Sequence, residues 1–351
     1  MRVFEYLNNG VDLRDRWEAR GRKKWAGIIG HGVTKNTGQN IAWNYLLERL
    51  HLDAEYVPLD LAPGARAEAV LARILVEAEA TPDMVGFKVA PPHKEAVFRA
   101  LETRATGAAV RLAVANTVGR RNGAFFCTNT DGDGMYDNLR EAFGNIDGLA
   151  ILIIGAGGAA TTIGDRVIPV ARRLILANRT AERPQRLKQL LERNHPGKQV
   201  QAIAISDIAS VIAEIDLVIN TTPVGREGPF ERFSALVSTA MAAEENQRAS
   251  ERIIGRLRSP IRFASVLYRP AREVMLQQAE KYGHRVANGL GMWIYQAAVA
   301  AKECFFPDEL QTTSLRTIAA VMRESLGVAS FPVLTTPATA EHSGAAHRNS
   351  Q

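Results

Sequence analysis

Residues 152–160 read Leu152-Ile153-Ile154-Gly155-Ala156-Gly157-Gly158-Ala159-Ala160, a glycine-rich turn that directly follows an apolar run. The spacing matches G-x-G-x-x-A. In that motif the first glycine permits the tight turn, the second lets the backbone approach a pyrophosphate, and the alanine allows a helix to pack closely on the strand. A helix that begins here offers free N–H groups to phosphate. The motif predicts a dinucleotide site with Gly155, Gly157, Gly158 and Ala159 as cofactor-binding candidates; the alternative is a glycine turn without a ligand.

The segments around this motif alternate between strand-like and helix-like patterns. Apolar runs predict strands at Leu149–Ile154, Arg173–Ala177, Gln199–Ile203, Leu217–Asn220 and Ile261–Val266. Apolar residues at helical spacing predict helices at Ala181–Arg193, Arg272–Tyr282 and Met292–Glu303. Such an alternation is typical of a parallel sheet covered by helices. We therefore predict an α/β domain of the Rossmann type.

The end of the second strand of such a domain indicates which cofactor it prefers. A domain that prefers NAD carries an acidic residue there, which binds the ribose diol. This chain reads Asn178-Arg179-Thr180-Ala181-Glu182-Arg183 instead, with two arginines one helical turn apart. Guanidinium groups bind a 2′-phosphate in bidentate fashion. NADP is the favoured cofactor, with Asn178, Arg179, Thr180 and Arg183 as candidates; if the arginines are only solvated surface charges, NAD is possible as well.

A second alternation precedes the first along the chain. Strands are expected at Trp25–Ile29, Glu55–Leu59 and Met84–Val89, and helices at Ile41–Leu50 and Ala65–Ala80. This pattern predicts another α/β domain with a largely parallel sheet. Residues 1–24 are polar and basic, with a short helix expected around Asp12–Arg20, and the composition from about Phe331 onward is that of a disordered tail.

Composition limits the classes of protein to be considered. The 351 residues suffice for two domains, and the formal net charge of +6 is spread along the chain without basic blocks that contain aromatic residues. Nucleic-acid binding is therefore not expected. The only two cysteines, Cys127 and Cys304, cannot form a disulfide framework, and no apolar run is long enough to span a bilayer. A cytoplasmic protein without membrane contact is expected, and no metal site is predicted.

Polar residues follow the first group of strands. Residues 86–94 end an apolar strand with two prolines and a lysine, so that Lys94 is presented at the carboxyl end of the strand, where ligands bind in open α/β sheets. Further polar clusters occupy 115–117 and 128–134. Taken alone, each is a turn more often than a site.

Together with the glycine-rich turn, these motifs follow one another in the same order as the motifs of a known family. From about residue 25 to 325 the chain resembles the shikimate dehydrogenase family. The matching stretches are Lys88–Lys94, Asn116-Thr117, Asn129–Gly134, Gly155–Ala159, Asn178–Arg183, Asn220–Gly225 and Gly289–Ala297.

The resemblance implies roles for individual residues. Lys94 and Asp131 correspond to the catalytic pair of the family, in which a lysine beside a carboxylate exchanges a proton with the reacting oxygen. Asn116, Gln296 and Tyr268 correspond to residues that hold the substrate, and for the last two the alternative is packing with a satisfied polar tip. Thr222 and Gly289 are implied on the cofactor side.

The chain departs from the family where the substrate carboxylate is held. The family has Gly-x-Pro-x-x-x-Ser-x-Ser-Pro there, whereas this chain reads Gly30–Gln39, with Asn36 and Gly38 in place of the serines, or Thr37 near one of them. In the next motif Lys88 replaces an asparagine and Ala90 a threonine. We expect Asn36, Thr37 and Lys88 to contact the substrate, although Lys88 as a solvated cation remains an alternative.

The resemblance also implies the domain organisation. A substrate-binding and catalytic domain is expected at 1–135 and 286–330, an NADP-binding Rossmann domain at 136–285, and a disordered tail at 331–351. The expected activity is reversible hydride transfer between NADP(H) and a shikimate- or quinate-like acid by a specialised family member. The alternatives are a dehydrogenase of a neutral cyclic polyol and a non-catalytic ligand sensor. The expected partner is a small-molecule substrate, in a monomer or homodimer.

Overall fold

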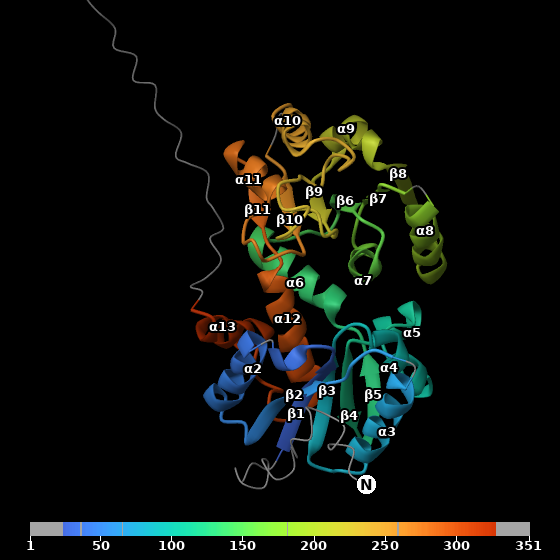
Figure 1. The fold of residues 1–351 in the computed structure, drawn as a ribbon, viewed down its shortest axis with the longest axis vertical. Helices are drawn as coiled ribbons and strands as arrows, with labels where there is room; N and C mark the ends of the chain where they lie inside the picture. Colours follow the sequence, from blue (N-terminus) through green and yellow to red (C-terminus); the bar gives the residue numbers. More distant parts are fainter. Residues whose placement is uncertain (1–23, 36, 65, 181, 258–259, 328–351) are drawn as a thin grey trace, which may run out of the picture.

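A computed structural model describes residues 24–35, 37–64, 66–180, 182–257 and 260–327. Two sheets, each with its own helices, lie one above the other in the view of Figure 1. The predicted helix at 12–20 and the predicted tail from 331 lie outside the described residues. Within the described part of the chain, no helix has the length and apolar character needed to cross a membrane.

The first sheet is mixed rather than largely parallel. Its strand order is β2 (Ala54–Asp60), β1 (Lys24–Gly30), β3 (Met84–Val89), β4 (Thr117–Arg121) and β5 (Ala124–Thr128). The pairs β1–β2 and β1–β3 are parallel, as predicted, whereas β3–β4 and β4–β5 are antiparallel. The last two strands form a hairpin that the prediction did not include.

The second sheet is parallel throughout. Its order is β11 (Arg285–Ala287), β10 (Arg262–Ser265), β9 (Leu217–Asn220), β6 (Ala150–Ile154), β7 (Arg173–Asn178) and β8 (Val200–Ala204). Because β6 has β9 on one side and β7 on the other, the strand order reverses beside β6. The carboxyl ends of parallel strands at such a point form the ligand-binding crevice of doubly wound folds. The predicted Rossmann fold is confirmed.

The helices extend the predicted set. Those expected from periodicity are α2 (Thr37–Arg49), α3 (Ala67–Glu79), α8 (Glu182–Asn194), α11 (Val274–Lys281) and α12 (Leu290–Ala300), which a π-helical turn at Ala301–Phe305 continues. The others are α4 (Lys94–Ala100), α5 (Ala108–Leu112), α6 (Asp131–Phe143), α7 (Gly158–Val167), α9 (Ile208–Val211), α10 (Ala243–Ile254) and α13 (Leu315–Ser325). Residues 131–134, interpreted from sequence as a turn former, are instead the first turn of α6.

The helices α6 and α12 pack against each other between the two sheets (Figure 1). Gly134 of α6 allows this approach, since a Cβ built there would lie 2.5 Å from the Met292 carbonyl oxygen and 2.7 Å from the Gln296 nitrogen. No side chain fits in that space. The contact fixes Asp131, at the start of α6, close to Gln296 of α12.

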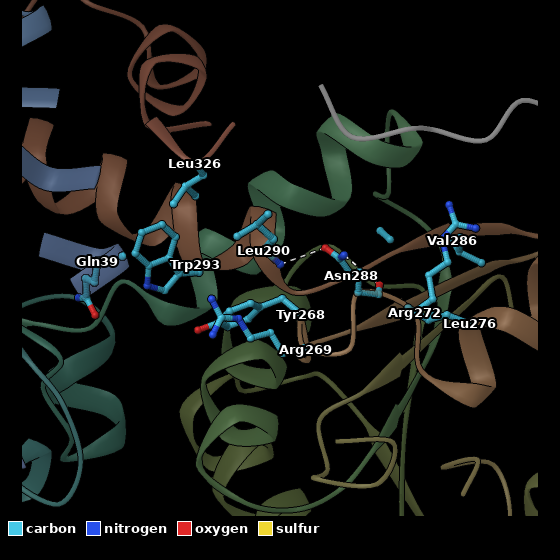
Figure 2. Close-up of a pocket in the computed structure, with 13 residues that line it drawn as sticks. Gln39, Tyr268, Arg269, Arg272, Leu276, Val286, Asn288, Leu290, Trp293 and Leu326 are labelled. Atoms are coloured by element: carbon cyan, nitrogen blue, oxygen red, sulfur yellow. Dashed lines mark hydrogen bonds between the residues drawn. The ribbon is translucent and has the colours of Figure 1, made fainter. Parts of the chain in front are cut away.

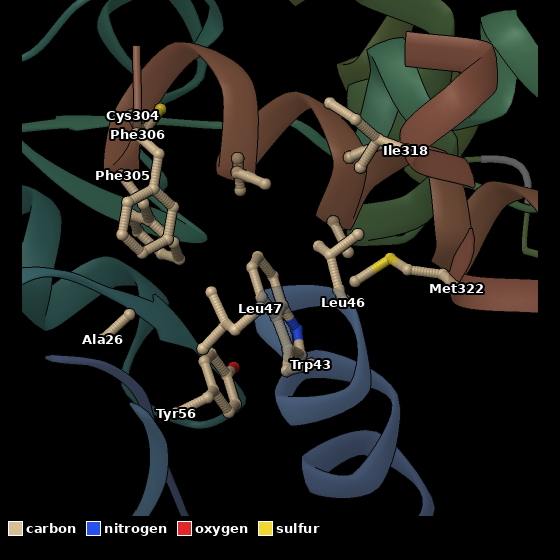
Figure 3. Packing of buried hydrophobic residues seen from close by; sticks show 14 of the residues in the cluster. Ala26, Trp43, Leu46, Leu47, Tyr56, Cys304, Phe305, Phe306, Ile318 and Met322 are labelled. Atoms are coloured by element: carbon tan, nitrogen blue, oxygen red, sulfur yellow. The ribbon is translucent and has the colours of Figure 1, made fainter. Parts of the chain in front are cut away.

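The C-terminal helices cover the first sheet. Figure 3 shows Trp43 of α2 packed among Tyr56, Phe305 and residues of α13. The Trp43 and Tyr56 rings stack with centroids 4.6 Å apart. Burial of each such ring contributes about 2–3 kcal/mol to stability. The chain therefore returns to the first sheet after it has formed the second sheet. The domain boundaries predicted from the sequence stay a prediction.

An ion-pair cluster joins the two sheet units at a second place. Asp165 of α7 is almost fully buried and accepts hydrogen bonds from Arg111 of α5, with Nε–Oδ1 at 3.0 Å and Nη2–Oδ2 at 2.6 Å. His195 Nε2 lies 2.9 Å from Oδ1 of the same carboxylate. A buried carboxylate is stable only when paired in this way, so the cluster ties α5 to α7 and to the end of α8.

Candidate active site

Lys94 and Asp131 form an ion pair at the carboxyl edge of the first sheet. Lys94 is the first residue of α4, after β3 and a turn with two prolines, and Asp131 is the first residue of α6, after β5. Lys94 Nζ donates to Asp131 Oδ2 at 2.7 Å, and Asn116 Nδ2 donates to Asp131 Oδ1 at 2.7 Å. Burial favours a higher pKa for Asp131, but the charges of Lys94 and Lys88 and these hydrogen bonds bring it below its ordinary value. Asp131 is therefore an ionised partner that orients the lysine.

Lys88 is a second cation in the same place, and it is buried. Its side chain is on β3, the residue is only 4% exposed, and Nζ donates to the hydroxyls of Thr117 at 2.8 Å and Thr130 at 3.0 Å. Burial lowers the pKa of Lys88 from 10.5 to about 7, against the opposing effect of Asp131. The interpretation of Lys88 as a solvated surface charge is wrong, because two hydroxyls replace water around the ammonium group.

These groups share one cavity of about 260 Å³. It gathers most of the predicted substrate and catalytic residues, namely Lys88, Lys94, Asn116, Asp131, Tyr268 and Gln296. Tyr268 is 39% exposed at its edge, and Gln296 is 7% exposed, with Nε2 donating to the Trp293 carbonyl. Gly289, predicted on the cofactor side, lines the same cavity. The cavity thus brings together polar groups from both sheet units.

The segment expected to hold a carboxylate is only partly described. Asn36 and the side chain of Thr37 lie outside the described residues, although Thr37 begins α2. The preceding turn is organised by Asp60 at the end of β2, a residue that sequence reasoning missed. Its Oδ1 accepts from the Gly32 N–H and its Oδ2 from the Thr34 hydroxyl, both at 2.8 Å. These bonds outweigh the effect of burial and lower the pKa of Asp60.

The glycine-rich turn has the geometry that a phosphate group requires. Gly155 follows β6 with φ at +115°, a conformation that favours glycine. The helix α7 begins at Gly158, and no side chain caps its N-terminus. A Cβ built at Gly157 or Gly158 would meet nothing within 4 Å, so the space beside both residues is open. Ala159 continues the first turn of α7. Uncapped N–H groups beside open space suit a pyrophosphate.

The predicted 2′-phosphate residues lie at the end of β7 and the start of α8. Arg179, Thr180 and Arg183 are exposed, and Asn178 Nδ2 donates to the Thr180 carbonyl at 3.2 Å. Neither guanidinium group forms a hydrogen bond or ion pair with another described residue. Two unpaired cations at this edge suit an anionic group.

The turn after β9 is stabilised by a buried carboxyl group that sequence reasoning missed. Thr222, predicted on the cofactor side, donates from its hydroxyl to Asn220 Oδ1 at 2.7 Å. Asn220 Nδ2 in turn donates to Glu273, at 2.9 and 2.8 Å from its two oxygens. Glu273 is 2% exposed, and burial raises its pKa to about 7 despite its hydrogen bonds to Asn220 and Ser265. A lone glutamate before an apolar helix carries no sequence signal for such a role.

Other residues at the site belong to recognised motifs but were not assigned. Thr117 and Thr130 hold Lys88, and the polar clusters at 116–117 and 129–131 were the available signal. Gln39 and Trp293 also line the 260 Å³ cavity. The backbone of Gly289 lies so close to Val266 that a Cβ there would be 2.0 Å from the Val266 carbonyl oxygen.

Comparison with known proteins gives consistent matches. The family model described as shikimate / quinate 5-dehydrogenase matches residues 137–228. A shikimate dehydrogenase (NADP(+)) of Citrifermentans bemidjiense is 32% identical over 284 residues, covering 80% of this chain and 89% of the relative. One from Alkaliphilus oremlandii is 28% identical, with coverage of 79% and 90%.

A solved structure extends the similarity to the fold. The shikimate 5-dehydrogenase of Listeria monocytogenes, in complex with shikimate and NAD, superposes with a TM-score of 0.70. It is 25% identical and is matched over 86% of this chain and 97% of its own length.

Proposed function

This chain belongs to the shikimate dehydrogenase family, and on that premise we propose that it catalyses reversible hydride transfer between NADP(H) and a shikimate- or quinate-like alicyclic hydroxy acid. The observation that carries the proposal is the Lys94–Asp131–Asn116 arrangement at the edge of a cavity that residues of the Rossmann unit also line. A ligand sensor has no chemical need for a lysine paired in this way. The arrangement favours an enzyme.

The residues on the cofactor side fit a dinucleotide with a 2′-phosphate. The open space beside Gly157 and Gly158 would receive the pyrophosphate, and Arg179 and Arg183 would pair with the 2′-phosphate. When bound, NADP supplies or accepts the hydride. The names of the curated relatives include NADP(+), while the Listeria structure holds NAD. The unpaired arginines favour NADP for this chain.

Proton transfer is assigned to Lys94. In the reducing direction Lys94 Nζ donates a proton to the substrate oxygen as its carbonyl becomes an alcohol, and in the oxidising direction the amine takes that proton back. Asp131 keeps the lysine aimed at the cavity, and Asn116 holds the second carboxylate oxygen so that the pair cannot rotate. A positioned acid–base group of this kind contributes about 10²–10⁴ in rate.

Lys88 decides between two classes of substrate. Two of its three N–H groups are occupied by Thr117 and Thr130, which leaves one for a ligand in the cavity. A hydrogen bond from an ammonium group to a carboxylate is among the strong ones, so an acid is the first candidate. The second candidate is a neutral cyclic polyol, which the replacement of the family's serine pair at 36 and 38 favours.

Turnover measurements distinguish these candidates. The purified protein with NADP⁺ or NAD⁺ is assayed by absorbance of the reduced nicotinamide against shikimate, quinate and several inositols. We expect NADP⁺-dependent turnover of shikimate or quinate. Turnover of inositols alone supports the neutral polyol, and binding without turnover of any compound overturns the proposal.

A further inference from the structure

A second cavity adjoins the catalytic one and is about twice as large. It has a volume of about 540 Å³, within the range of small-molecule sites. Gln39, Tyr268 and Trp293 line both cavities. Figure 2 shows its labelled side chains extending from Gln39 and Trp293 at one end to Arg272, Leu276 and Val286 at the other. The two cavities are therefore neighbours that meet at the same three side chains.

The larger cavity is not part of the predicted cofactor site. None of the predicted cofactor residues lines it. Its walls come from the loop after β10, from β11 at the edge of the second sheet, and from the starts of α2 and α12. The glycine-rich turn and the predicted 2′-phosphate residues lie at β6 and β7, on the other side of β9 and β10, and Thr222 and Gly289 do not line the larger cavity either. The larger cavity is therefore not lined by the residues assigned to the dinucleotide.

The lining is apolar with a cation at its edge. Leu276, Val286 and Leu290 supply apolar wall, and Leu326 closes one side. Two arginines are present. Arg272 pairs with Glu280, whereas the exposed Arg269 forms no hydrogen bond or ion pair with any residue in the described ranges. Arg269 directly follows Tyr268, which lies between the two cavities.

We propose that the larger cavity binds an apolar substituent of the substrate that ends in an anionic group, with Arg269 as its counter-ion. The inference rests on the proposed function: the reacting ring occupies the smaller cavity beside Lys94, and its side arm passes Tyr268 and Trp293 into the larger one. An unpaired guanidinium group at the edge of an apolar cavity selects a ligand with an apolar body and one acidic end. A single-ring acid leaves this space unfilled.

Binding is tested without turnover, using 8-anilinonaphthalene-1-sulfonate as a probe with an apolar body and one anionic group. Titration is done on the whole protein with saturating NADP⁺, so that the cofactor site is occupied. We expect one saturable site, weakened about tenfold by Arg269→Ala and unchanged by Arg256→Ala, which removes an exposed arginine elsewhere in the second unit. Equal affinity in the two variants, or no saturable binding, overturns the proposal.

A second variant tests the cavity itself. Ala271 is exposed and lines the cavity, so Ala271→Trp fills the space from its edge without disturbing the core. It should abolish probe binding while leaving the thermal midpoint within about 2 °C of the parent protein. Probe binding that persists at full strength places the probe elsewhere and contradicts the assignment.

Turnover then tests the link to the reaction. Esters of shikimate with glutaric acid, which end in a free carboxylate, are compared with butyrate esters, which do not. The ratio of their kcat/KM values should exceed about tenfold in the parent protein and fall to near one in Arg269→Ala. A ratio near one in the parent overturns the side-arm assignment. If no alicyclic substrate is turned over but the probe still binds at Arg269, the proposed function fails and the cavity remains a ligand site.

Discussion

Replacing Lys88 with methionine isolates the energetic effect of burying a lysine in the catalytic cavity. Methionine has a similar length and no charge, and it removes the two hydrogen bonds to Thr117 and Thr130. The loss of those bonds does not depend on pH, whereas the ionisation of Lys88 does. The prediction therefore concerns how the difference in unfolding free energy between the two proteins changes with pH.

The sign follows from the lowered pKa of Lys88, which is about 7 in the folded protein against an ordinary 10.5. Between these values the unfolded chain binds one proton more than the folded protein, so the stability of the parent protein rises with pH. The slope is about 1.4 kcal/mol per pH unit. From pH 6 to pH 9 the parent should gain about 2–3 kcal/mol relative to Lys88→Met.

Urea unfolding at pH 6 and pH 9 measures this difference. Other groups that titrate in the range, Glu273 among them, are present in both proteins and cancel. Lys35→Met, which removes an exposed lysine, is the matched control and should track the parent at both values. A difference between Lys88→Met and the parent that is the same at pH 6 and pH 9 would refute a buried Lys88 with a lowered pKa.

Three further predictions concern the Rossmann unit. Gly157→Ala should raise the Kd for NADP⁺ at least tenfold in a fluorescence titration, with an unchanged thermal midpoint, because its Cβ would lie in the open space with no protein atom within 4 Å; loss of stability instead would show that this space is not open. Arg183→Ala should lower the preference for NADP⁺ over NAD⁺, measured as the ratio of kcat/KM values, by about 10–100-fold. Arg186→Ala, which removes another exposed arginine of α8, should leave this ratio unchanged. The same ratio in Arg183→Ala and in the parent protein would count against a 2′-phosphate role for Arg183. Burial raises the pKa of Glu273 to about 7, so the folded protein binds the extra proton between the ordinary value and pH 7. On the order of 3 kcal/mol of stability should therefore be lost as pH rises from 4.5 to 7 in urea unfolding, and Glu273→Gln should lack this loss.

The second sheet was largely predictable from sequence. Its central strands are buried on both faces and read as continuous apolar runs. All five predicted strands begin and end within a residue of the observed bounds, as at Arg173–Asn178. Because the ends of these strands could be located in the sequence, the candidate cofactor residues that follow them could be named as well. Tertiary packing has little freedom to override a pattern of this strength.

The first sheet was less predictable because its distinguishing features depend on contacts distant in sequence. The hairpin of β4 and β5 turns at Asn122-Gly123, both in left-handed backbone, and this dipeptide was an available turn signal. The helix α6 carries two glycines in its first turn, which lower helix propensity. The close packing of Gly134 against α12 and of Gly132 against α7, where a Cβ would lie 2.4 Å from the Thr162 carbonyl oxygen, explains them.

The charge state of the site could not be predicted from sequence. A lysine is ordinarily exposed, and Lys88 is buried only because Thr117 and Thr130 converge on it from β4 and from the turn before α6. Lys94, Asp131 and Asn116 could be listed from motifs, whereas the distances between them required the fold. The larger cavity depends on α2, α12 and the loop after β10 meeting, which no local pattern contains.

The most direct test of the proposed chemistry is the NADP⁺-dependent turnover of the Lys94→Ala protein, measured together with its Kd for NADP⁺. With Lys94 as the proton-transferring group, kcat on the parent's best alicyclic substrate should fall by about 10²–10⁴. The Kd for NADP⁺ should stay within about twofold, because Lys94 begins α4 beside the first sheet and is not part of the glycine-rich turn. Near-normal turnover by Lys94→Ala would contradict the assignment of Lys94 as the catalytic acid–base.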